Sequence, residues 1–227
     1  MTKNYFVLDH PVWNALTSAH QTMARANGLA IRYPNAVSPL AALREPTPQA
    51  FADLHALVGS GEIVGLVTAE PLEVPDDWKV LLARPIDQMI CTATPIFSPI
   101  RLMRLTDEDV PEMLALTAVT EPGPFLAGTI QMGHYFGVRS NTGRLVAMAG
   151  QRMELGEFIE ISAVCTHPEF RGNGYAQSLV GSLCAQILSE GKTPILHVKT
   201  ENAAKTLYEK IGFNVRRAVQ FTVLTPQ

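Results

Sequence analysis

The chain lacks the features of a membrane, secreted or disulfide-stabilised protein. Its 227 residues contain no run of about 20 apolar residues, the length that a membrane-spanning helix needs. Residues 1–5 lead into no apolar segment with a small-residue cleavage site. Cysteine is scarce, and three unclustered residues argue against a disulfide framework or a Cys-rich zinc site. These absences predict a cytoplasmic protein with no metal site and no membrane partner.

Charge is also sparse. Charged residues make up 17% of the chain and the net charge is −3, so nothing in the charge balance favours nucleic acid as a partner. A hydrophobic content of 47% excludes a largely disordered chain. The composition is therefore that of a folded protein with a sizeable core.

Proline and glycine are unevenly divided along the chain. Nine of the 16 prolines but only four of the 16 glycines fall within residues 1–97. Two helices, around Trp13 and Phe51, and two short strands, at residues 63–67 and 78–82, are expected there. Residues 94–99, with two prolines, are typical of a boundary. The sequence predicts a smaller N-terminal α/β domain over residues 1–97 and a second domain over residues 98–227.

The second part has clearer signals for strands and helices. Strands are expected at residues 100–105, 135–138, 144–148, 158–165 and 195–198, with two short β-like runs within 213–224. Thr106 is expected to cap a first helix that ends near residue 120. Two more helices are expected at residues 175–190 and 203–211, ended by Gly191 and Gly212.

A glycine-containing loop leads into the longest predicted helix. Gly172 and Gly174 allow positive φ and a close approach of backbone to a ligand. The first N–H groups of the helix have no partner within it and carry positive partial charge, and Arg171 adds a cation. The loop matches neither a Walker A motif nor the full dinucleotide fingerprint. It is suited to a pyrophosphate, although a plain strand-to-helix turn would use the same glycines.

The string EISAVCTHPEFRGNGYA at residues 160–176 resembles the acetyl-CoA site of the GNAT superfamily of N-acyltransferases. The family loop is Arg/Gln-x-x-Gly-x-Gly/Ala, and its His-Pro-x-Phe-Arg-Gly form is most similar to the FR47-like branch. A second family motif is matched by NAAKTLYEKIGF at residues 202–213. The resemblance implies a mixed, mostly antiparallel sheet flanked by helices, an α/β (α+β) fold. It covers residues 98–224; residues 1–97 are either a degenerate copy of the same fold or a different unit.

The resemblance also implies where acetyl-CoA binds. It implies that the cofactor lies between the strand at residues 161–166 and a splayed neighbour at residues 195–198. Asn202 is implied as a contact; because it stands six residues before Tyr208 rather than the usual seven, it is alternatively a helix N-cap. Backbone contacts to the pantetheine arm are implied for Val164 and Thr166. The implied pyrophosphate contacts are Arg171, Gly172, Asn173, Gly174, Tyr175 and Ala176.

Two residues are candidates for acid–base chemistry. By resemblance Tyr208 is the acid that protonates the leaving thiolate; its alternative is a core tyrosine. Glu160 is the predicted base for an acceptor that starts as an ammonium ion; its alternative is a solvated carboxylate at a strand end. With a period of two, Glu160, Ser162 and Val164 share one face of their strand. Cys165 is a less favoured nucleophile, because a buried thiol is more often inert packing.

The sequence thus predicts an acetyl-CoA-dependent N-acyltransferase that acts on a small amine or amino acid in a ternary complex. Residues 1–97 are expected either to cap the acceptor region or to form a homodimer contact. One alternative is a non-catalytic acyl-CoA-binding regulatory module. The other is a protein or peptide N-acetyltransferase, which an open, acidic groove would favour over a pocket roofed by residues 1–97.

Overall fold

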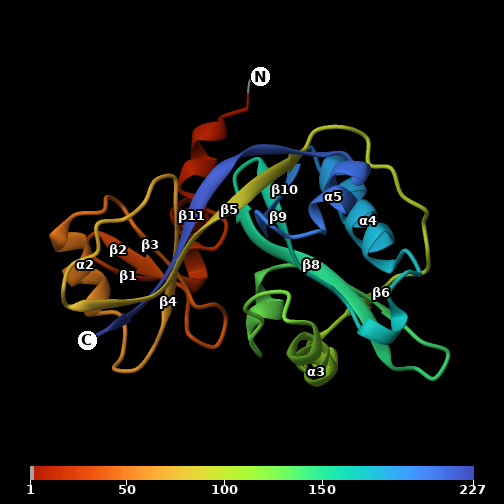
Figure 1. Cartoon of the computed structure of the whole chain (residues 1–227), viewed down its shortest axis with the longest axis horizontal. Helices are drawn as coiled ribbons and strands as arrows, with labels where there is room; N and C mark the ends of the chain where they lie inside the picture. Colours follow the sequence, from red (N-terminus) through yellow and green to blue (C-terminus); the bar gives the residue numbers. More distant parts are fainter. Residues whose placement is uncertain (1–2) are drawn as a thin grey trace.

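In the computed structural model, which describes residues 3–227, the strands form one continuous sheet of eleven (Figure 1). The N-terminal half contains α1 (Pro11–Leu16), β1 (Arg25–Asn27), β2 (Ala30–Arg32), β3 (Leu40–Leu43), α2 (Pro48–His55), β4 (Val64–Thr68) and β5 (Trp78–Cys91). The C-terminal half contains β6 (Met103–Leu105), α3 (Val110–Thr120), β7 (Tyr135–Arg139), β8 (Leu145–Leu155), β9 (Phe158–Thr166), α4 (Tyr175–Ser189), β10 (Thr193–Lys199), α5 (Lys205–Ile211) and β11 (Phe213–Pro226). The sheet is mixed and mostly antiparallel, as predicted, and helices pack against it.

The predicted helices of the C-terminal half and its predicted strands up to residue 198 are confirmed as elements, with Thr106 forming a capping box with Asp109 at the start of the first helix. The predictions for the N-terminal half are less accurate. The helix around Trp13 ends at Leu16, and three short strands, β1 to β3, were not predicted. β5 extends over 14 residues, and the predicted pair of β-like runs at the C-terminus is one 14-residue strand, β11.

β5 and β11 cross the middle of the molecule together and tie the two halves into one sheet (Figure 1). Residues 86–90 of β5 pair with β10, deep in the C-terminal half. Residues 220–224 of β11 pair with β4, in the N-terminal half. The two halves therefore exchange strands: β5, from the first half of the chain, pairs within the C-terminal half, and β11, from the end of the chain, pairs within the N-terminal half. The predicted boundary at residue 97 lies in the segment between β5 and β6, but the sheet does not divide there, and the two-domain division stays a prediction.

The two halves repeat one arrangement on either side of β11 and β5. The sheet order is β1-β2-β3-β4-β11-β5-β10-β9-β8-β7-β6. In the N-terminal half β3 and β4 are parallel neighbours connected through α2, and in the C-terminal half β9 and β10 are parallel neighbours connected through α4. A degenerate second copy of one unit would produce this pattern, and that origin for residues 1–97 stays a prediction.

β9 and β10 separate soon after they begin. Their parallel pairing covers only three positions, the last of which joins Glu160 to Ile195. Beyond this point the two strands diverge, as predicted from the sequence. On its other side β9 bulges between Ser162 and Cys165, where the register with β8 shifts and Ala163 adopts a φ of 53°. The divergence opens a gap in the sheet, and the bulge changes which side chains face it.

Apolar side chains fill both faces of the sheet. One core lies under α4 and α5 and includes Leu179, Leu183 and Ile211. On the opposite face, α1 and α3 cover cores that include Leu16 and Met113. None of the helices within residues 3–227 is long and apolar enough to cross a membrane. The site described next lies where these layers meet the gap between β9 and β10.

Candidate active site

A single cavity of about 690 Å³ brings together nearly all of the predicted site residues. Ligand pockets commonly have about 300–1,000 Å³. The cavity lies at the gap between β9 and β10 and reaches the loop before α4. Its lining includes ten predicted site residues: Val164, Thr166, Arg171, Gly172, Asn173, Gly174, Tyr175, Ala176, Asn202 and Tyr208. Glu160, the predicted base, does not line it.

The loop before α4 has the geometry of an anion site. Gly172 and Gly174 have φ values of +83° and +73°, in the left-handed region that favours glycine. A β-carbon at either glycine would have no atom within 4 Å, so the loop surface there is open. Among the described residues, the N–H groups of residues 172–177 find no backbone acceptor. A row of free N–H groups at the positive end of a 15-residue helix fits a pyrophosphate.

The segment of β9 around the bulge carries a second candidate contact for a ligand. Ala163 and Val164 have no partner in the register with β8, and β10 has already diverged from them. Thr166 Oγ1 is buried and has no hydrogen-bond partner in the part of the chain that the structure describes. Ligand pockets typically place a few such groups on an apolar lining. The gap between the strands therefore fits a ligand that carries amide groups.

The bulge also overturns one prediction. Glu160, Ser162 and Val164 were expected on one face of the strand. Instead Val164 packs with Ile161 against α4, whereas Ala163 joins the core on the α3 side. The prediction was wrong because a bulge places two successive residues on the same side and shifts the alternation that follows.

Tyr208 lies in α5 with its ring packed against Phe213 and borders the cavity. Burial is the main cause that raises the pKa of Tyr208 to about 12, so its hydroxyl is protonated at neutral pH. Asn202 lines the cavity, and its contact with a cofactor stays a prediction. Its Oδ1 accepts a hydrogen bond from the N–H of Ala204 (2.9 Å), but Ala204 rather than Asn202 is the N-cap of α5, so the N-cap alternative is wrong.

Glu160 is fully buried, so its alternative as a solvated carboxylate is wrong. Its two oxygens accept hydrogen bonds from Arg152 Nε (2.7 Å) and Nη2 (2.5 Å). His197 Nδ1 lies 2.7 Å from Oε1. Burial alone would raise the pKa of Glu160, but the charge of Arg152 and the contact with His197 hold it at about 2. A carboxylate held in this way is poorly suited to remove a proton from an acceptor.

A glutamine fixes the tautomer of His197. Gln88 Oε1 accepts a hydrogen bond from Arg216 (2.9 Å), and its Nε2 donates to the carbonyl of Leu8 (2.9 Å). The same Nε2 lies 3.0 Å from His197 Nε2, which must then accept. His197 therefore carries its proton on Nδ1 and donates it to Glu160. Both ring nitrogens are engaged, so His197 is not a free base.

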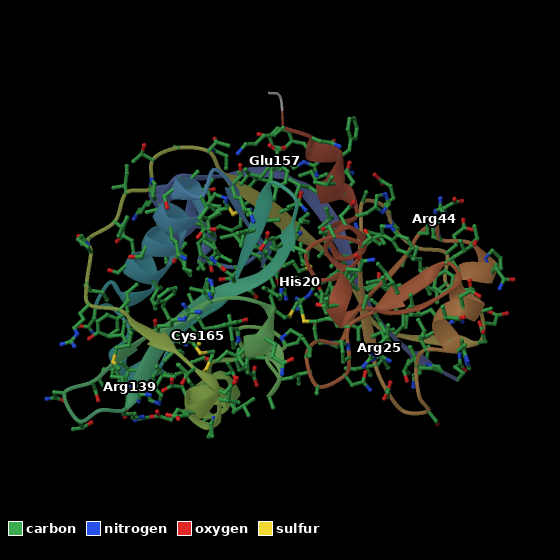
Figure 2. The ribbon with its side chains drawn as sticks, turned by 180° about the vertical axis from the view of Figure 1, so that it is seen from behind. His20, Arg25, Arg44, Arg139, Glu157 and Cys165 are labelled. Atoms are coloured by element: carbon green, nitrogen blue, oxygen red, sulfur yellow. The ribbon has the colours of Figure 1, made fainter. Side chains whose placement is uncertain are left out.

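Cys165 lines the cavity on the α3 side, and Figure 2 shows it between α3 and the sheet. Burial raises the pKa of its thiol to about 11. A thiol that remains protonated at neutral pH is a weak nucleophile. The geometry is thus in line with the sequence analysis, in which packing was the favoured role for Cys165.

Sequence reasoning missed two groups of cavity residues. The first is Arg152 and His197. His197 stands between apolar neighbours in β10, and that contrast is the signal that could have identified it, whereas Arg152 follows Gln151 in β8 and shows no such contrast. The second group, Leu40, Val67, Arg84, Ile86 and Phe221, lies on strands of the N-terminal half or on the exchanged strands β5 and β11. No local signal marks them, because they reach the cavity only through the pairing of distant strands.

The corresponding position in the N-terminal half is filled. A space of only about 20 Å³ remains beside β3 and β4, and His10 and Trp13 from the start of α1 line it. A cavity needs about 10–15 Å³ for one water molecule, so this position has no room for a cofactor. Of the two repeated halves, the C-terminal one carries the site.

Comparison with known proteins gives the class of protein that this fold and site define. The FR47-like protein family matches residues 135–222. A protein from Novosphingobium aromaticivorans DSM 12444 that is assigned to the GNAT family of acetyltransferases is 40% identical, and the match covers 97% of this chain and 98% of that one, with a TM-score of 0.90. The chain belongs to the GNAT family and is a GNAT-type N-acetyltransferase with an FR47-like domain.

Two more distant relatives are similar to the chain, one in its fold and the other in a short stretch of sequence. A GCN5-related N-acetyltransferase from Kribbella flavida is 15% identical and matches 94% of this chain and 95% of that one, with a TM-score of 0.64. The [ribosomal protein bS18]-alanine N-acetyltransferase of Haemophilus influenzae is 44% identical over 48 residues. That match covers 21% of this chain and only 33% of the relative. The first likeness shows the fold, and the second is a local match.

Proposed function

We propose that the chain transfers the acetyl group of acetyl-CoA to a primary amine of a small molecule, by direct attack while both substrates are bound. The observation that supports this most is the extent of the cavity. It runs from the free N–H groups of residues 172–177, past the gap between β9 and β10, to a wall made by Leu40, Val67 and Phe221. The end with the free N–H groups suits a pyrophosphate. The opposite end of the cavity, where the acceptor would bind, is bounded by the N-terminal half.

Acetyl-CoA would supply the acetyl group as a thioester. The Arg171 side chain and the N–H groups of residues 172–176 would hold its pyrophosphate, and the backbone of Val164 and Thr166 its pantetheine arm. Ala163 and Val164, which the bulge takes out of register with β8, would lie beside a carbonyl oxygen on which negative charge develops. Tyr208 keeps the proton that a departing thiolate needs.

We assign Glu160 a positioning role rather than that of base. Its carboxylate orients Arg152 and His197, and both of these side chains line the acceptor end of the cavity. The proton of the incoming ammonium group then leaves through water in the cavity. Attack by the neutral amine needs no acyl-enzyme, in agreement with the protonated thiol of Cys165.

A protein amine is the second candidate acceptor, favoured by the 48-residue match to the bS18-alanine N-acetyltransferase. An acidic groove would suit a basic protein segment. Among the described residues that line the cavity, Glu121 is the only carboxylate, whereas Arg84, Arg152, Arg171 and Lys199 are cationic. The wall from the N-terminal half and the scarcity of carboxylates favour a small molecule.

The proposal is tested with a panel of small amines and one basic peptide, measuring the release of free CoA thiol. We expect turnover with small amines, and a higher Tm with acetyl-CoA by mass action. Arg171→Glu should weaken CoA binding at least about tenfold, because it replaces a charge-assisted contact with repulsion. Arg44→Glu is the matched control on the outer side of the N-terminal half (Figure 2). No thiol release with any amine and no Tm shift at millimolar acetyl-CoA would contradict the proposal; a Tm shift without turnover would favour the regulatory module.

Tyr208→Phe should lower kcat by about 10²–10⁴-fold, the usual contribution of a positioned acid. Affinity for CoA should stay within about twofold, because the ring and its packing on Phe213 remain. The measurement is steady-state turnover together with CoA binding by calorimetry. Tyr5→Phe, at an exposed tyrosine, is the control. A normal kcat for Tyr208→Phe would assign the tyrosine to the core and leave the acid unidentified.

A further inference from the structure

The acceptor end of the cavity carries separate charges of both signs. Arg152 is already neutralised by the buried carboxylate of Glu160. The remaining charged side chains at this end are Arg84 on β5, Lys199 on β10 and Glu121 in the segment after α3. The two cations thus come from the sheet and the carboxylate from a different element. A ligand that carries both an ammonium and an anionic group would match this division.

The two cations are neighbours on one face of the sheet. Ile86 pairs directly with Lys199 across β5 and β10, and Arg84 lies two residues from Ile86 without a break in register. Because side chains alternate between faces, Arg84 and Lys199 are diagonal neighbours on the face that bears His197. His197 is two residues from Lys199, about 7 Å along an extended strand. The cations therefore lie next to His197, which belongs to the buried network around Glu160.

Most hydrogen-bond donors of these cations are unused. Arg84 donates through Nη1 to Glu201 (3.1 Å), whose side chain is 67% exposed. Exposed ion pairs of this kind contribute about 0–1 kcal/mol. Within residues 3–227 no partner is found for the Lys199 ammonium or for the other N–H groups of Arg84. A guanidinium presents five donors in a fork that matches a carboxylate.

An apolar wall adjoins this charged rim. Phe221 pairs with Arg84 on β5 and with Val67 on β4, so the wall and the cation lie in one row across the sheet. Gly65 leaves room for the ring, since a β-carbon there would lie 2.9 Å from Phe221. Leu40 and Ile86 complete the wall. This surface suits an apolar side chain next to the anionic group.

We propose that the acceptor is an α-amino acid with an apolar side chain, and that Arg84 and Lys199 determine specificity by binding its carboxylate. Glu121 attracts its ammonium group into the cavity, and Leu40, Val67, Ile86 and Phe221 contact its side chain. The inference rests on the proposed function and adds the class of acceptor. It also gives the N-terminal half and the exchanged strand β5 a direct part in substrate choice.

The test compares each amino acid with its decarboxylated amine: L-phenylalanine with phenethylamine, and L-leucine with isopentylamine. We expect kcat/KM to favour the amino acid at least about tenfold, the usual worth of hydrogen bonds to a charged group. Arg84→Gln should remove most of this preference by raising KM for the amino acid, with little effect on the amine. Arg84→Lys should restore part of it. Arg44→Gln, at an exposed arginine, should leave both substrates unchanged.

Two results would overturn the inference while leaving the proposed function intact. The first is equal or better turnover of the decarboxylated amines by the unaltered enzyme. The second is an equal loss for both substrates in Arg84→Gln, which would indicate a structural role. Failure of the proposed function itself would look different: no amine of either kind would release CoA thiol, and acetyl-CoA would not raise the Tm.

Discussion

Glu160→Gln is expected to lower the free energy of unfolding by about 3–5 kcal/mol, the usual cost of removing one partner of a buried ion pair. The substitution keeps the shape of the side chain but leaves the guanidinium of Arg152 without a counter-charge in the interior. His197 also loses its charged acceptor. Urea unfolding at neutral pH measures the change.

Glu157→Gln is the matched control, three residues upstream in the exposed turn between β8 and β9 (Figure 2). Surface substitutions usually change stability by no more than about 0.5 kcal/mol. A double variant, Arg152→Met with Glu160→Leu, should recover part of the loss, because apolar pairs often replace buried ion pairs well. If Glu160→Gln were as stable as the unaltered protein and lost only kcat, Glu160 would be the base after all.

The same ion pair makes stability depend on pH in the acid range. The pKa of Glu160 falls from its ordinary value of 4.5 to about 2 in the folded protein. A depressed folded pKa stabilises the protein fully above the unfolded value, and the contribution is lost as pH falls from about 5 towards 2. Its size is roughly 3 kcal/mol. The free energy of unfolding should therefore fall more steeply over this interval in the unaltered protein than in Glu160→Gln.

The parts of the site that could be predicted from sequence are those built from local signals. Gly172, Gly174, Gly191 and Gly212 all adopt the positive φ that their positions at helix ends suggested. Thr106 likewise caps the helix that follows it. Each signal depends on residues close in the chain, so a single sequence contains all the information needed to read it.

The network around Glu160 could not be predicted, because its members meet only through strand pairing. Arg152 comes from β8, His197 from β10 and Gln88 from β5. The sequence gives neither the order of these strands nor their register. The bulge at Ala163 shifts the register between β8 and β9 further. No nearby residue signals this bulge, because a non-glycine residue at positive φ is uncommon.

β5 continues through Pro85, well beyond the expected strand at residues 78–82. A proline has no N–H for the ladder and usually marks an edge strand or the end of a strand. Here Pro85 pairs with Gln220 on β11, and pairing with β10 begins only at the next residue, Ile86. The proline thus lies where one side of β5 has no neighbour, and the strand continues past it into the C-terminal half.

Because β5 extends into the C-terminal half, residues 98–227 expressed alone should not fold. Removing β5 leaves β10 paired only with β9, over three positions, and removes the β5 partner of β11 over residues 213–226. Met89 and Cys91, both fully buried beneath α4 and α5, would be lost from the core. His197 would also lose Gln88. We expect the fragment to show no cooperative transition in urea and to bind no CoA.

Expressing residues 1–97 and 98–227 together as separate chains should restore folding and CoA binding. The cut falls between β5 and β6, so the two fragments together supply every strand of the sheet. Co-purification of the fragments and cooperative unfolding of the complex would be the measurements. If residues 98–227 alone unfolded cooperatively and bound CoA like the full chain, the exchange of β5 and β11 would be dispensable and the halves would be independent domains. The expected result instead means that the acceptor wall and the cofactor site fold together. Both depend on β5, which carries Arg84 and Ile86 and also pairs with β10.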